Sequence, residues 1–525
     1  MGNFINIGNN NFKEARADEY VDKSMLIAAI NKTLGTKRKM TCVTRCRRFG
    51  KSMAADMLCA YYDKSCDSRE LFRGLEIEKD PSFEKHLNKY SVIFVSLTTF
   101  TSKFDHDPEI VKKMEQALMS DIHADFPDVE KLPQDDLMDL LSRIALAKDE
   151  KFFMIIDEWD AIIREFKDSE KVMDEYVKFL RRLFKDPITS RVFVGAYITG
   201  ILPIKKYNTQ SALNNFREYT MIQPGKLASY FGFTKPEVEA LGRKYGVDPE
   251  ELEQWYDGYR IGTEPSMFNP NSVMTAIDNG VCANYWSSTG AYDNVARYIQ
   301  MNFEGLKEDI VRMIAGEECT VNYVRFNNDL KEIKSRDDVL TILIHLGYLS
   351  YNPDTRKCYI PNREVREEME SAVLATKWKE LISAINSSEA LLRAVLNRDE
   401  ASVAAGVEKV HQDVVSIQKY NDEDNLSQVV YLAFYSAISD YIIHREYQSG
   451  KGFADLAFIP RKHGDAPALL IELKYNKSVT TALDQIRERN YPDKIREYAS
   501  NIILVGINYD PHTKTHTCKI EPLRH

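Results

Sequence analysis

The sequence predicts an α/β multidomain protein in which two α/β segments flank a mainly helical middle. At 525 residues the chain is too long for a single hydrophobic core. Short apolar runs alternate with helical stretches over about the first 225 residues, and strand-like runs begin again after residue 443. The first pattern is typical of an α/β domain with a parallel sheet. We therefore expect domains at residues 1–225, 226–390 and 391–525.

The composition is that of an ordinary soluble protein, with 44% hydrophobic and 28% charged residues and a net charge of −9. No apolar run is long enough to span a membrane, and the N-terminus lacks the pattern of a signal peptide, so we expect a cytoplasmic protein without membrane association. The eight cysteines show no C-x-x-C spacing, which argues against a disulfide framework and a zinc site. The negative charge argues against indiscriminate coating of nucleic acid but leaves local basic clusters.

Four apolar runs are the expected strands of the first segment. They lack clean polar alternation, as strands buried on both faces should. Between them, helical periodicity predicts several helices. The expected strands are Met40–Thr44, Val92–Leu97, Phe152–Ile156 and Val192–Thr199, and the helices include Met53–Tyr62, Ile110–His123 and Val172–Phe184.

The first strand leads into a phosphate-binding loop, because residues 39–52 read KMTCVTRCRRFGKS and end in Gly50, Lys51 and Ser52. Lys51 would neutralise the charge of the β- and γ-phosphates, and Ser52 would ligate Mg²⁺. The N-terminus of the following helix would direct its N–H groups at the anion. These residues predict an ATP site.

Arginines surround this loop. Arg45 stands where the pattern G-x-x-x-x-G-K-[ST] has its first glycine. Arg45, Arg47 and Arg48 would either contact the ATP phosphates or face a partner surface, and we count Arg48 with the nucleotide-binding residues. Arg181 and Arg182 could stabilise a transition state in cis or across a homo-oligomer, although a solvated helix face is the commoner explanation.

The third expected strand runs directly into Asp157 and Glu158. Asp157 would hold the Mg²⁺ shell, and Glu158 would polarise the attacking water. A solvated acidic turn is the alternative, and the Gly50-Lys51-Ser52 loop makes it the weaker one. Thr199, at the end of the fourth strand, would sense the γ-phosphate or simply precede a glycine turn.

The middle segment carries one unusual run, Trp255–Arg260 (WYDGYR), followed by Phe268-Asn269-Pro270. A packed turn explains these aromatics better than a ligand-stacking role does. Val339–Leu349 is expected to be an amphipathic helix, and Tyr348–Ile360 a hairpin that turns at Asn352. Helix and hairpin together predict a winged-helix unit that either touches DNA or couples two domains.

A polar connector, Asn421–Asn425, marks a boundary, and a helix is expected over Leu426–Ile443. Asp455 then opens one apolar strand, while Glu472 and Lys474 lie two residues apart on the next. Residues at i and i+2 project from the same face of a strand, and a hairpin would bring Asp455 beside them.

Two acids beside a lysine predict a metal site on this second segment. Asp455 and Glu472 would hold one or two Mg²⁺ ions, and Lys474 would orient water or stabilise charge at a phosphodiester. A helix holding Gln485, with Tyr491 beyond it, would pack beside the site. A charged solvent face is the plainer alternative, but the apolar run before Glu472 favours an interior strand, where unpaired acids are costly.

The N-terminal half resembles the bacterial AAA-ATPase-like family. The resemblance rests on YVDKS at Tyr20–Ser24, RRFGKS at Arg47–Ser52 and the acids Asp157 and Glu158. The middle adds WYDGY and the IPN-x-E-V run at Ile360–Val365. This family's loop is similarly rich in arginine, so the resemblance implies a P-loop NTPase domain with a variant phosphate loop that uses ATP and Mg²⁺.

The C-terminal 110 or so residues resemble the PD-(D/E)XK nuclease superfamily domain that accompanies this ATPase. Asp455, Glu472 and Lys474 fall on its D…E-x-K positions. The resemblance implies an α/β restriction-endonuclease-like nuclease. It also places an additional acid at Glu446 and a residue beside the metal at Gln485.

The two chemistries together predict an ATPase coupled to a Mg²⁺-dependent nuclease, with nucleic acid as partner and DNA as the favoured substrate. Mobile-element processing or defence against foreign DNA is the role that this pairing suggests. Two alternatives stay open: a nucleotide-switched scaffold that binds nucleic acid without cleaving it, and a degenerate ATPase around a constitutive nuclease. The oligomeric state also stays open, with a homo-oligomer among the options. No helicase-type motif set is evident, so we expect ATP to gate cleavage.

Overall fold

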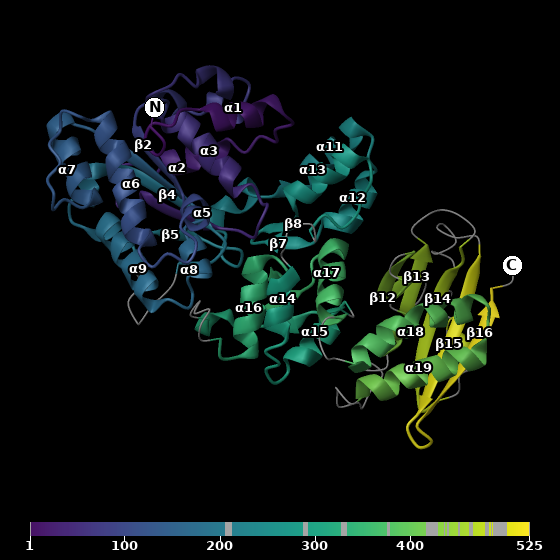
Figure 1. Ribbon diagram of the computed structural model, residues 1–525. Coiled ribbons are helices and arrows are strands. Elements are labelled where there is room, and N and C mark those ends of the chain that lie inside the picture. Colours follow the sequence, from purple (N-terminus) through teal and green to yellow (C-terminus); the bar gives the residue numbers. More distant parts are fainter. Residues whose placement is uncertain are drawn as a thin grey trace. The chain divides into compact units, whose positions relative to one another are not determined.

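The computed structural model divides into two compact units (Figure 1). The first comprises Met1–Val295 and Cys319–Met369, and the second comprises Ala296–Glu318 and Glu370–His525. The residues described are 2–204, 213–286, 292–314, 316–326, 333–374, 379–415, 429–434, 436–437, 440–449, 452–460, 466–477, 482–484, 486 and 501–523.

A five-stranded parallel sheet forms the centre of the first unit, with strand order β2-β3-β4-β1-β5. The predicted parallel sheet is therefore confirmed, and its four predicted strands lie within one residue of their expected bounds. The fifth strand was not expected, because it is only three residues long. The strands are β1 (Met40–Thr44), β2 (Ser91–Ser96), β3 (Phe152–Asp157), β4 (Phe193–Gly200) and β5 (Arg217–Tyr219).

Helices cover both faces of this sheet, and each face has its own hydrophobic core (Figure 1). Along β3, Phe152 and Met154 belong to the core beneath α6, α7 and α9, whereas Phe153 and Ile155 belong to the core beneath α2 and α3. Alternate side chains of a strand point to opposite faces, so a strand buried twice must be apolar throughout. This explains the absence of polar alternation in the sequence.

The helices of this α/β part agree with the predicted ones to within two residues. They are α1 (Asn10–Ala17), α2 (Met25–Asn31), α3 (Lys51–Tyr62), α4 (Phe83–His86), α5 (Leu97–Lys103), α6 (Ile110–Asp125), α7 (Leu137–Lys148), α8 (Ala161–Glu165), α9 (Glu170–Lys185) and α10 (Thr189–Val192).

Two small antiparallel sheets and several helices follow within the first unit. The sheets have strand orders β6-β8-β7 and β10-β11-β9. The elements are β6 (Phe233–Thr234), α11 (Lys235–Tyr245), α12 (Pro249–Tyr256), β7 (Tyr259–Ile261), β8 (Glu264–Phe268), α13 (Pro270–Asn279), β9 (Cys319–Thr320), α16 (Arg336–Leu346), β10 (Ser350–Asn352) and β11 (Lys357–Tyr359).

The predicted helix followed by a hairpin is present as α16, β10 and β11. The helix ends three residues earlier than expected, because Gly347 adopts a left-handed conformation with φ of +90° and caps it. Every residue from Val339 to His345 is buried, so α16 has no free face for a DNA groove. This burial argues against base reading by this helix, and the coupling of two domains stays a prediction.

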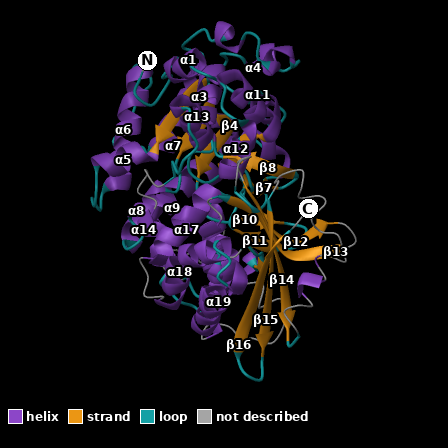
Figure 2. Ribbon diagram, turned by 90° about the vertical axis from the view of Figure 1, so that its right-hand side faces the viewer, coloured by secondary structure: helices purple, strands orange, loops and turns teal. Residues whose placement is uncertain are grey.

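The second unit contains a five-stranded mixed sheet of order β12-β13-β14-β15-β16, in which only β14 and β15 pair in parallel. Helices α18 and α19 pack together, and α19 also contacts β16 (Figure 2). The elements are α15 (Leu306–Ile314), α18 (Lys379–Leu396), α19 (Glu400–Val415), β12 (Tyr441–Ser449), β13 (Gly452–Pro460), β14 (Ala468–Tyr475), β15 (Ile502–Asp510) and β16 (Thr515–Pro522). Two further helices, α14 (Tyr292–Ile299) and α17 (Arg363–Leu374), each contain a boundary between the two units, so that one part of the helix belongs to each unit.

One predicted helix, Leu426–Ile443, is wrong at its C-terminal end. Strand β12 already begins at Tyr441 and pairs with β13, because its β-branched and aromatic residues suit a strand. The connector Asn421–Asn425 lies outside the described residues, as do Gln485 and Tyr491. In the ranges described above, no helix has the length and apolar character needed to cross a membrane.

Candidate active sites

The phosphate loop joins the end of β1 to the start of α3. Two of its residues have left-handed backbones: Arg48 has φ of +66°, and Gly50 has φ of +82° and caps α3. A glycine adopts this conformation without strain, which explains its place before Lys51. The first turn of α3 carries N–H groups that have no partner within a helix, which suits them to bind an anion.

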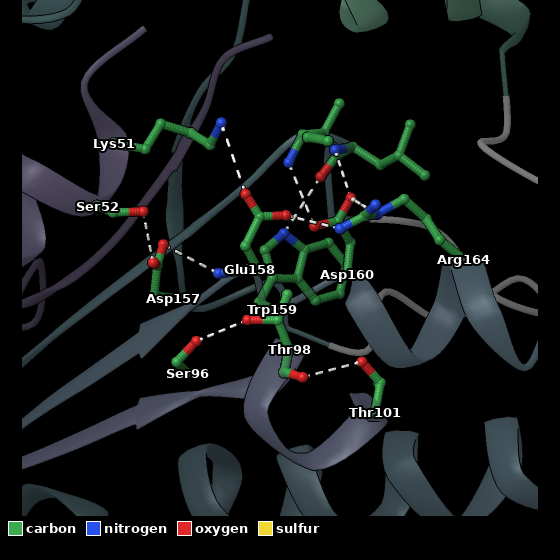
Figure 3. Close-up of polar contacts among 12 residues, drawn as sticks. Lys51, Ser52, Ser96, Thr98, Thr101, Asp157, Glu158, Trp159, Asp160 and Arg164 are labelled. Atoms are coloured by element: carbon green, nitrogen blue, oxygen red, sulfur yellow. Dashed lines mark hydrogen bonds and ion pairs between the residues drawn. The ribbon is translucent and has the colours of Figure 1, made fainter. Parts of the chain in front are cut away.

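Lys51, Ser52 and Asp157 meet beside this turn (Figure 3). Ser52 Oγ donates a hydrogen bond to Asp157 Oδ2 over 2.7 Å, although the two residues are 105 positions apart. Lys51 is 4% exposed, and its Nζ donates to the carbonyl oxygen of Cys46 over 3.0 Å. Burial raises the pKa of Asp157, while the hydroxyl of Ser52 opposes the shift. The loop and the third strand thus bring together the residues that the motifs selected.

Glu158 lies between two cations. Its Oε1 is 3.8 Å from Lys51 Nζ, and its Oε2 accepts a hydrogen bond from Arg164 Nη2 over 2.6 Å. The backbone of Glu158 is left-handed, with φ of +53°. Burial raises the pKa of its carboxyl group, and the charge of Lys51 acts in the opposite direction. The side chain is therefore held between Lys51 and Arg164, while the backbone N–H of Glu158 donates to Asp157 Oδ1 over 3.1 Å.

A cavity of about 710 Å³ opens over these groups. Its wall carries polar and charged residues, which include Lys23, Arg47, Arg48, Lys51, Ser52, Thr98, Glu158 and Arg164. It also carries apolar and aromatic residues, which include Tyr20, Val21, Met57, Tyr230, Phe233 and Met274. A wall with both kinds of residue suits a nucleotide, which joins phosphates to a base.

The apolar and aromatic part of the wall was not predicted as part of a site. Tyr20, Val21 and Lys23 of the YVDK run line the cavity, and Lys23 donates to both carboxylate oxygens of Glu237 over 2.7 Å and to the carbonyl of Ser229 over 2.9 Å. Pro270, the last residue of the FNP run, and Asn271, which follows it, also line the cavity. Both runs were visible in the sequence, but only the fold shows that they belong to this wall.

Arg45 was predicted either to contact the ATP phosphates or to face a partner surface, and it does neither. Its side chain is fully buried and is absent from the cavity wall. Nη1 donates to the carbonyls of Thr44 and Tyr219 over 2.9 Å each, and the guanidinium lies 5.3 Å from the ring centroid of Phe231. Burial lowers the pKa of Arg45 to about 10. The residue therefore replaces a loop glycine by directing its side chain into the protein, between β1 and β5.

Arg47 and Arg48 do line the cavity, and Arg48 Nη1 donates to the carbonyl of Tyr285 over 3.3 Å. Arg182 does not line the cavity. Its guanidinium forms ion pairs with the carboxylates of Asp136, Asp139 and Asp186, which neutralise its positive charge.

Thr199 is fully buried and does not line the cavity, which favours the second of its two interpretations, a strand end before a glycine turn. Its carbonyl accepts a hydrogen bond from the backbone N–H of Trp159 over 2.9 Å. Thr98 lies at the cavity instead, one residue into α5, and its hydroxyl is 2.9 Å from that of Ser96 (Figure 3). Ser96 pairs with Asp157 across β2 and β3.

The WYDGY run packs behind the phosphate loop, which confirms the packed turn. The ring of Tyr259 meets that of Phe49 edge to face at 5.1 Å, and its hydroxyl donates to the carbonyl of Gly347 over 2.8 Å. A Cβ on Gly347 would lie 2.6 Å from the Cβ of Cys46. The end of α16 and the WYDGY turn therefore both press on the loop.

The IPN-x-E-V run meets the same turn. A Cβ on Gly258 would lie 1.8 Å from the carbonyl oxygen of Pro361, and Gly258 has φ of +115°. Asn362 Nδ2 donates to the carbonyl of Tyr256 over 3.2 Å, and the guanidinium of Arg363 lies 3.9 Å from the ring centroid of Trp255. The phosphate loop, the WYDGY run and the IPN-x-E-V run, which are distant in sequence, thus pack together, and we call this packed region the junction.

Glu364 connects this junction to the cavity wall. Its carboxylate is fully buried and accepts hydrogen bonds from Ser272 Oγ and the backbone N–H of Tyr285, each over 2.9 Å. Tyr285 also receives the bond from Arg48, and Ser272 follows Asn271 of the cavity wall directly in α13. Burial raises the pKa of Glu364 to about 7.

In the second unit, antiparallel pairing of β13 with β14 brings the other predicted residues together. Leu456 pairs with Ile471, so Asp455 and Glu472 are the next facing positions. Asp455 Oδ2 accepts from the backbone N–H of Leu473 over 2.6 Å, and Lys474 Nζ donates to Glu472 Oε1 over 2.9 Å. Glu472 is fully buried and Lys474 is 6% exposed. The strand is interior, not a charged solvent face.

The carboxylate of Glu472 is destabilised in its charged form. Burial and, secondly, the charge of Asp455 raise its pKa to about 7. A divalent cation would relieve both effects, because it would bind the two acids in their ionised form. The side chain of Glu446, in β12, lies outside the side chains that the structure describes.

Both groups of oxygen ligands fit Mg²⁺. Within the described part of the chain, no group of three or more His, Cys, Asp and Glu residues gathers in a metal-binding cluster. Mg²⁺ usually takes only one or two carboxylates and completes its shell with phosphates and water. Ser52 with Asp157, and Asp455 with Glu472, meet that description.

Comparison with known families agrees with the two predicted segments. Residues 6–209 match the AAA-ATPase-like family, described as "Predicted AAA-ATPase", and residues 421–518 match the PD-(D/E)XK nuclease superfamily. A protein of Azotobacter chroococcum mcd 1, described as uncharacterized and lying in the vnfD 5′ region, is 20% identical over 491 residues, which cover 90% of each chain.

Among solved structures, the ORC2 protein of Aeropyrum pernix in its ADPNP–ADP complexes is 12% identical, with a TM-score of 0.34 over 69% of this chain and 98% of that one. The ORC1 protein of the same organism, in complex with DNA, is 10% identical, with a TM-score of 0.27 over 71% and 97%. Neither likeness is close enough to support an argument about ligands.

Proposed function

We propose that this protein binds and hydrolyses ATP at the Lys51 loop and that the nucleotide state controls a Mg²⁺-dependent nuclease in the second unit. The proposal rests on the AAA-ATPase-like and PD-(D/E)XK matches. The observation that carries it is geometric: in each unit, residues from separate strands or loops place a lysine beside acids at predicted motif positions.

At the first site, Lys51 and the N-terminus of α3 would bind the β- and γ-phosphates, with Arg48 beside them. Ser52 and Asp157, now 2.7 Å apart, would hold Mg²⁺, which supplies neutralisation of the phosphate charge. Glu158 would accept the proton of the attacking water. The apolar and aromatic residues of the cavity wall would pack against the base.

At the second site, Asp455 and Glu472 would hold Mg²⁺, and Lys474 would orient the water or stabilise charge that develops on the phosphodiester. DNA is the substrate we propose first. Control by ATP is supported by the contacts of Arg48 and Ser272 with the junction around Glu364, because α17 begins there and continues along the chain into the second unit.

The deciding experiment measures cleavage of single- and double-stranded DNA and RNA by the full chain with Mg²⁺ or Mn²⁺, with ATP present or absent. We expect metal-dependent cleavage that changes with ATP and that disappears on addition of EDTA. Absence of cleavage for every substrate and both metals would refute the nuclease part.

Lys474→Ala separates a nuclease from a nucleic-acid-binding scaffold. We expect cleavage to fall at least about 100-fold, because a charge-stabilising group is lost from the site, while DNA binding is retained. Lys519→Ala serves as the matched control, since Lys519 lies on the same sheet in β16 and is 3.7 Å from the carboxylate of Glu400. Equal behaviour of the two variants would support the scaffold instead.

A further inference from the structure

Arg164 is a residue of the cavity wall that no sequence motif selects. It lies on α8, and its guanidinium is shared between two carboxylates (Figure 3). Nη2 donates to Glu158 Oε2 over 2.6 Å, and Nε donates to Asp160 Oδ2 over 3.2 Å. The Arg164 side chain is 18% exposed, so the two ion pairs lie largely out of water. An ion pair in this environment is less screened than one on the surface.

Asp160 is a fixed anchor for this arginine. Its side chain is fully buried and accepts hydrogen bonds from the backbone N–H groups of Ile201, over 3.2 Å, and Leu202, over 2.9 Å. These two residues follow β4, whereas Asp160 follows β3. Asp160 therefore connects the ends of two neighbouring parallel strands and, through Oδ2, sets the position of the Arg164 guanidinium.

The backbone at Glu158 is fixed as well. Trp159 N–H donates to the carbonyl of Thr199 over 2.9 Å, and the hydroxyl of Tyr176 donates to the carbonyl of Trp159 over 2.7 Å. With its main chain held, Glu158 can move only by rotating its side chain. Lys51 and Arg164 are the two cations that restrict this rotation. Because Lys51 would turn to the phosphates of bound ATP, Arg164 would then be the cation that holds the carboxylate.

We propose that Arg164, anchored by Asp160, is a positioning residue that fixes the carboxylate of Glu158 for ATP hydrolysis. This inference rests on the proposed ATPase function. In the reaction, the water oxygen bonds to the γ-phosphorus, the bond to the β–γ bridging oxygen breaks, and that electron pair leaves on ADP. The water proton passes to Glu158. Oε2 is engaged by Arg164, so Oε1, on the side of Lys51, is the atom that accepts it.

The test is a double-mutant cycle in the full chain, with Arg164→Gln, Glu158→Gln and both changes together. Arg164→Gln is expected to lower kcat for ATP hydrolysis about 10- to 100-fold, the scale of a misplaced catalytic group. KM and the Kd for ATP should stay within about twofold, because the residue acts through Glu158 and not on the nucleotide. In the Glu158→Gln background, adding Arg164→Gln should change kcat by less than about twofold.

Two further variants sharpen the result. Arg164→Lys should recover part of the lost kcat, because an ammonium reaches a carboxylate but lacks the planar fork that serves two. Arg143→Gln is the matched control, since Arg143 also loses a carboxylate partner, Asp135, and is absent from the wall of this cavity, and its kcat should equal that of the wild type. Additive losses in the cycle, or a large rise in the Kd for ATP with Arg164→Gln, would overturn the proposal.

A structural measurement distinguishes failure of this inference from failure of the proposed function. If the wild type hydrolyses no ATP, the proposed ATPase is refuted, and a crystal structure of Arg164→Gln then decides the positioning role. We expect the Glu158 carboxylate to leave its place or occupy several rotamers, while Asp160 keeps its bonds to Ile201 and Leu202. An unmoved Glu158 would overturn the inference.

Discussion

Several charged side chains of the first unit are completely buried, and each is held by backbone groups. Arg45 donates to main-chain carbonyls, Asp160 accepts from two main-chain N–H groups, and Glu364 accepts from one and from a serine hydroxyl. Burying a charge is costly unless hydrogen bonds compensate it. Such residues hold the main chain around them, so the candidate nucleotide site is supported by groups that do not line the cavity.

Glu364→Gln tests this at a single residue. The pKa of Glu364 is raised by burial to about 7, above the usual value of 4.5. Its stabilising contribution is therefore complete below about pH 4.5 and is lost as the pH rises through 7. The shift corresponds to at most about 3 kcal/mol. A glutamine has the same shape and no charge, so the variant should resemble the wild type at pH 5 and be more stable at pH 8.

The measurement is the melting temperature of both proteins at pH 5, 6, 7 and 8. We expect the difference between them to grow in favour of Glu364→Gln across this range. Asp399→Asn, an exposed change in the second unit, provides a control for the effect of the pH series itself. A constant difference between Glu364→Gln and the wild type would contradict the assigned burial of charge.

At the scale of elements, the phosphate loop is held from behind by the WYDGY turn, the IPN-x-E-V run and the end of α16. The ring of Tyr259 meets that of Phe49 in the loop, Gly347 lies against the Cys46 side chain, and Gly258 lies against the backbone of Pro361. Close approaches of this kind tolerate little change in volume. In the proposed function, these contacts are the route by which ATP bound at the loop would act on the junction.

Gly258→Ala is predicted to break this junction. The added Cβ would lie 1.8 Å from the carbonyl oxygen of Pro361, and φ of +115° is unsuited to alanine. We expect a loss of about 3 kcal/mol or more, seen as a lower melting temperature and a lower affinity for ATP. Gly280→Ala is the control, because Gly280 also has positive φ, +65°, but nothing lies within 4 Å of its Cβ position.

Gly280→Ala should cost only about 1–2 kcal/mol, the usual penalty for a left-handed alanine. Equal destabilisation by the two variants would show that the contact with Pro361 is not what requires glycine at position 258.

For the whole molecule, the proposed function joins two chemistries through one chain. Helix α17 contains Glu364 near its start and passes from the first unit into the second. A ligand can shift an equilibrium only by its difference in affinity for the two states. ATP would therefore control cleavage only if its binding changes the junction at Glu364.

Lys51→Ala tests this control. We expect the variant to lose at least about tenfold in ATP affinity, since a charge-assisted contact to phosphate is removed. Metal-dependent cleavage should persist at the level that the wild type shows without ATP, and added ATP should no longer change it. Calorimetry of ATP binding and cleavage assays on the same preparations measure both effects. Equal, negligible ATP binding in wild type and variant would instead indicate a degenerate ATPase domain.

The sequence by itself determined the local parts of both sites. The buried strands, the Gly50-Lys51-Ser52 loop and the acids that end β3 are visible because they depend on short runs of residues whose chemistry is specific. The spacing of Glu472 and Lys474 on one strand was sufficient to predict that they share a face, and their side chains are 2.9 Å apart. Local geometry repeats in every strand, so such pairs follow from periodicity.

Only the tertiary structure decided which residues from distant parts of the chain contact these local motifs. Arg45 was expected at a phosphate or a partner and is buried against carbonyls of residues more than 170 positions away. Thr98, and not Thr199, lies at the cavity, which decides between the two interpretations of Thr199. Arg164 contacts Glu158 while Asp160, bonded to the backbone of Leu202 after β4, accepts from its Nε. Which distant segments meet depends on the order of strands in a sheet and on side-chain packing, and neither is encoded in the period of a short run.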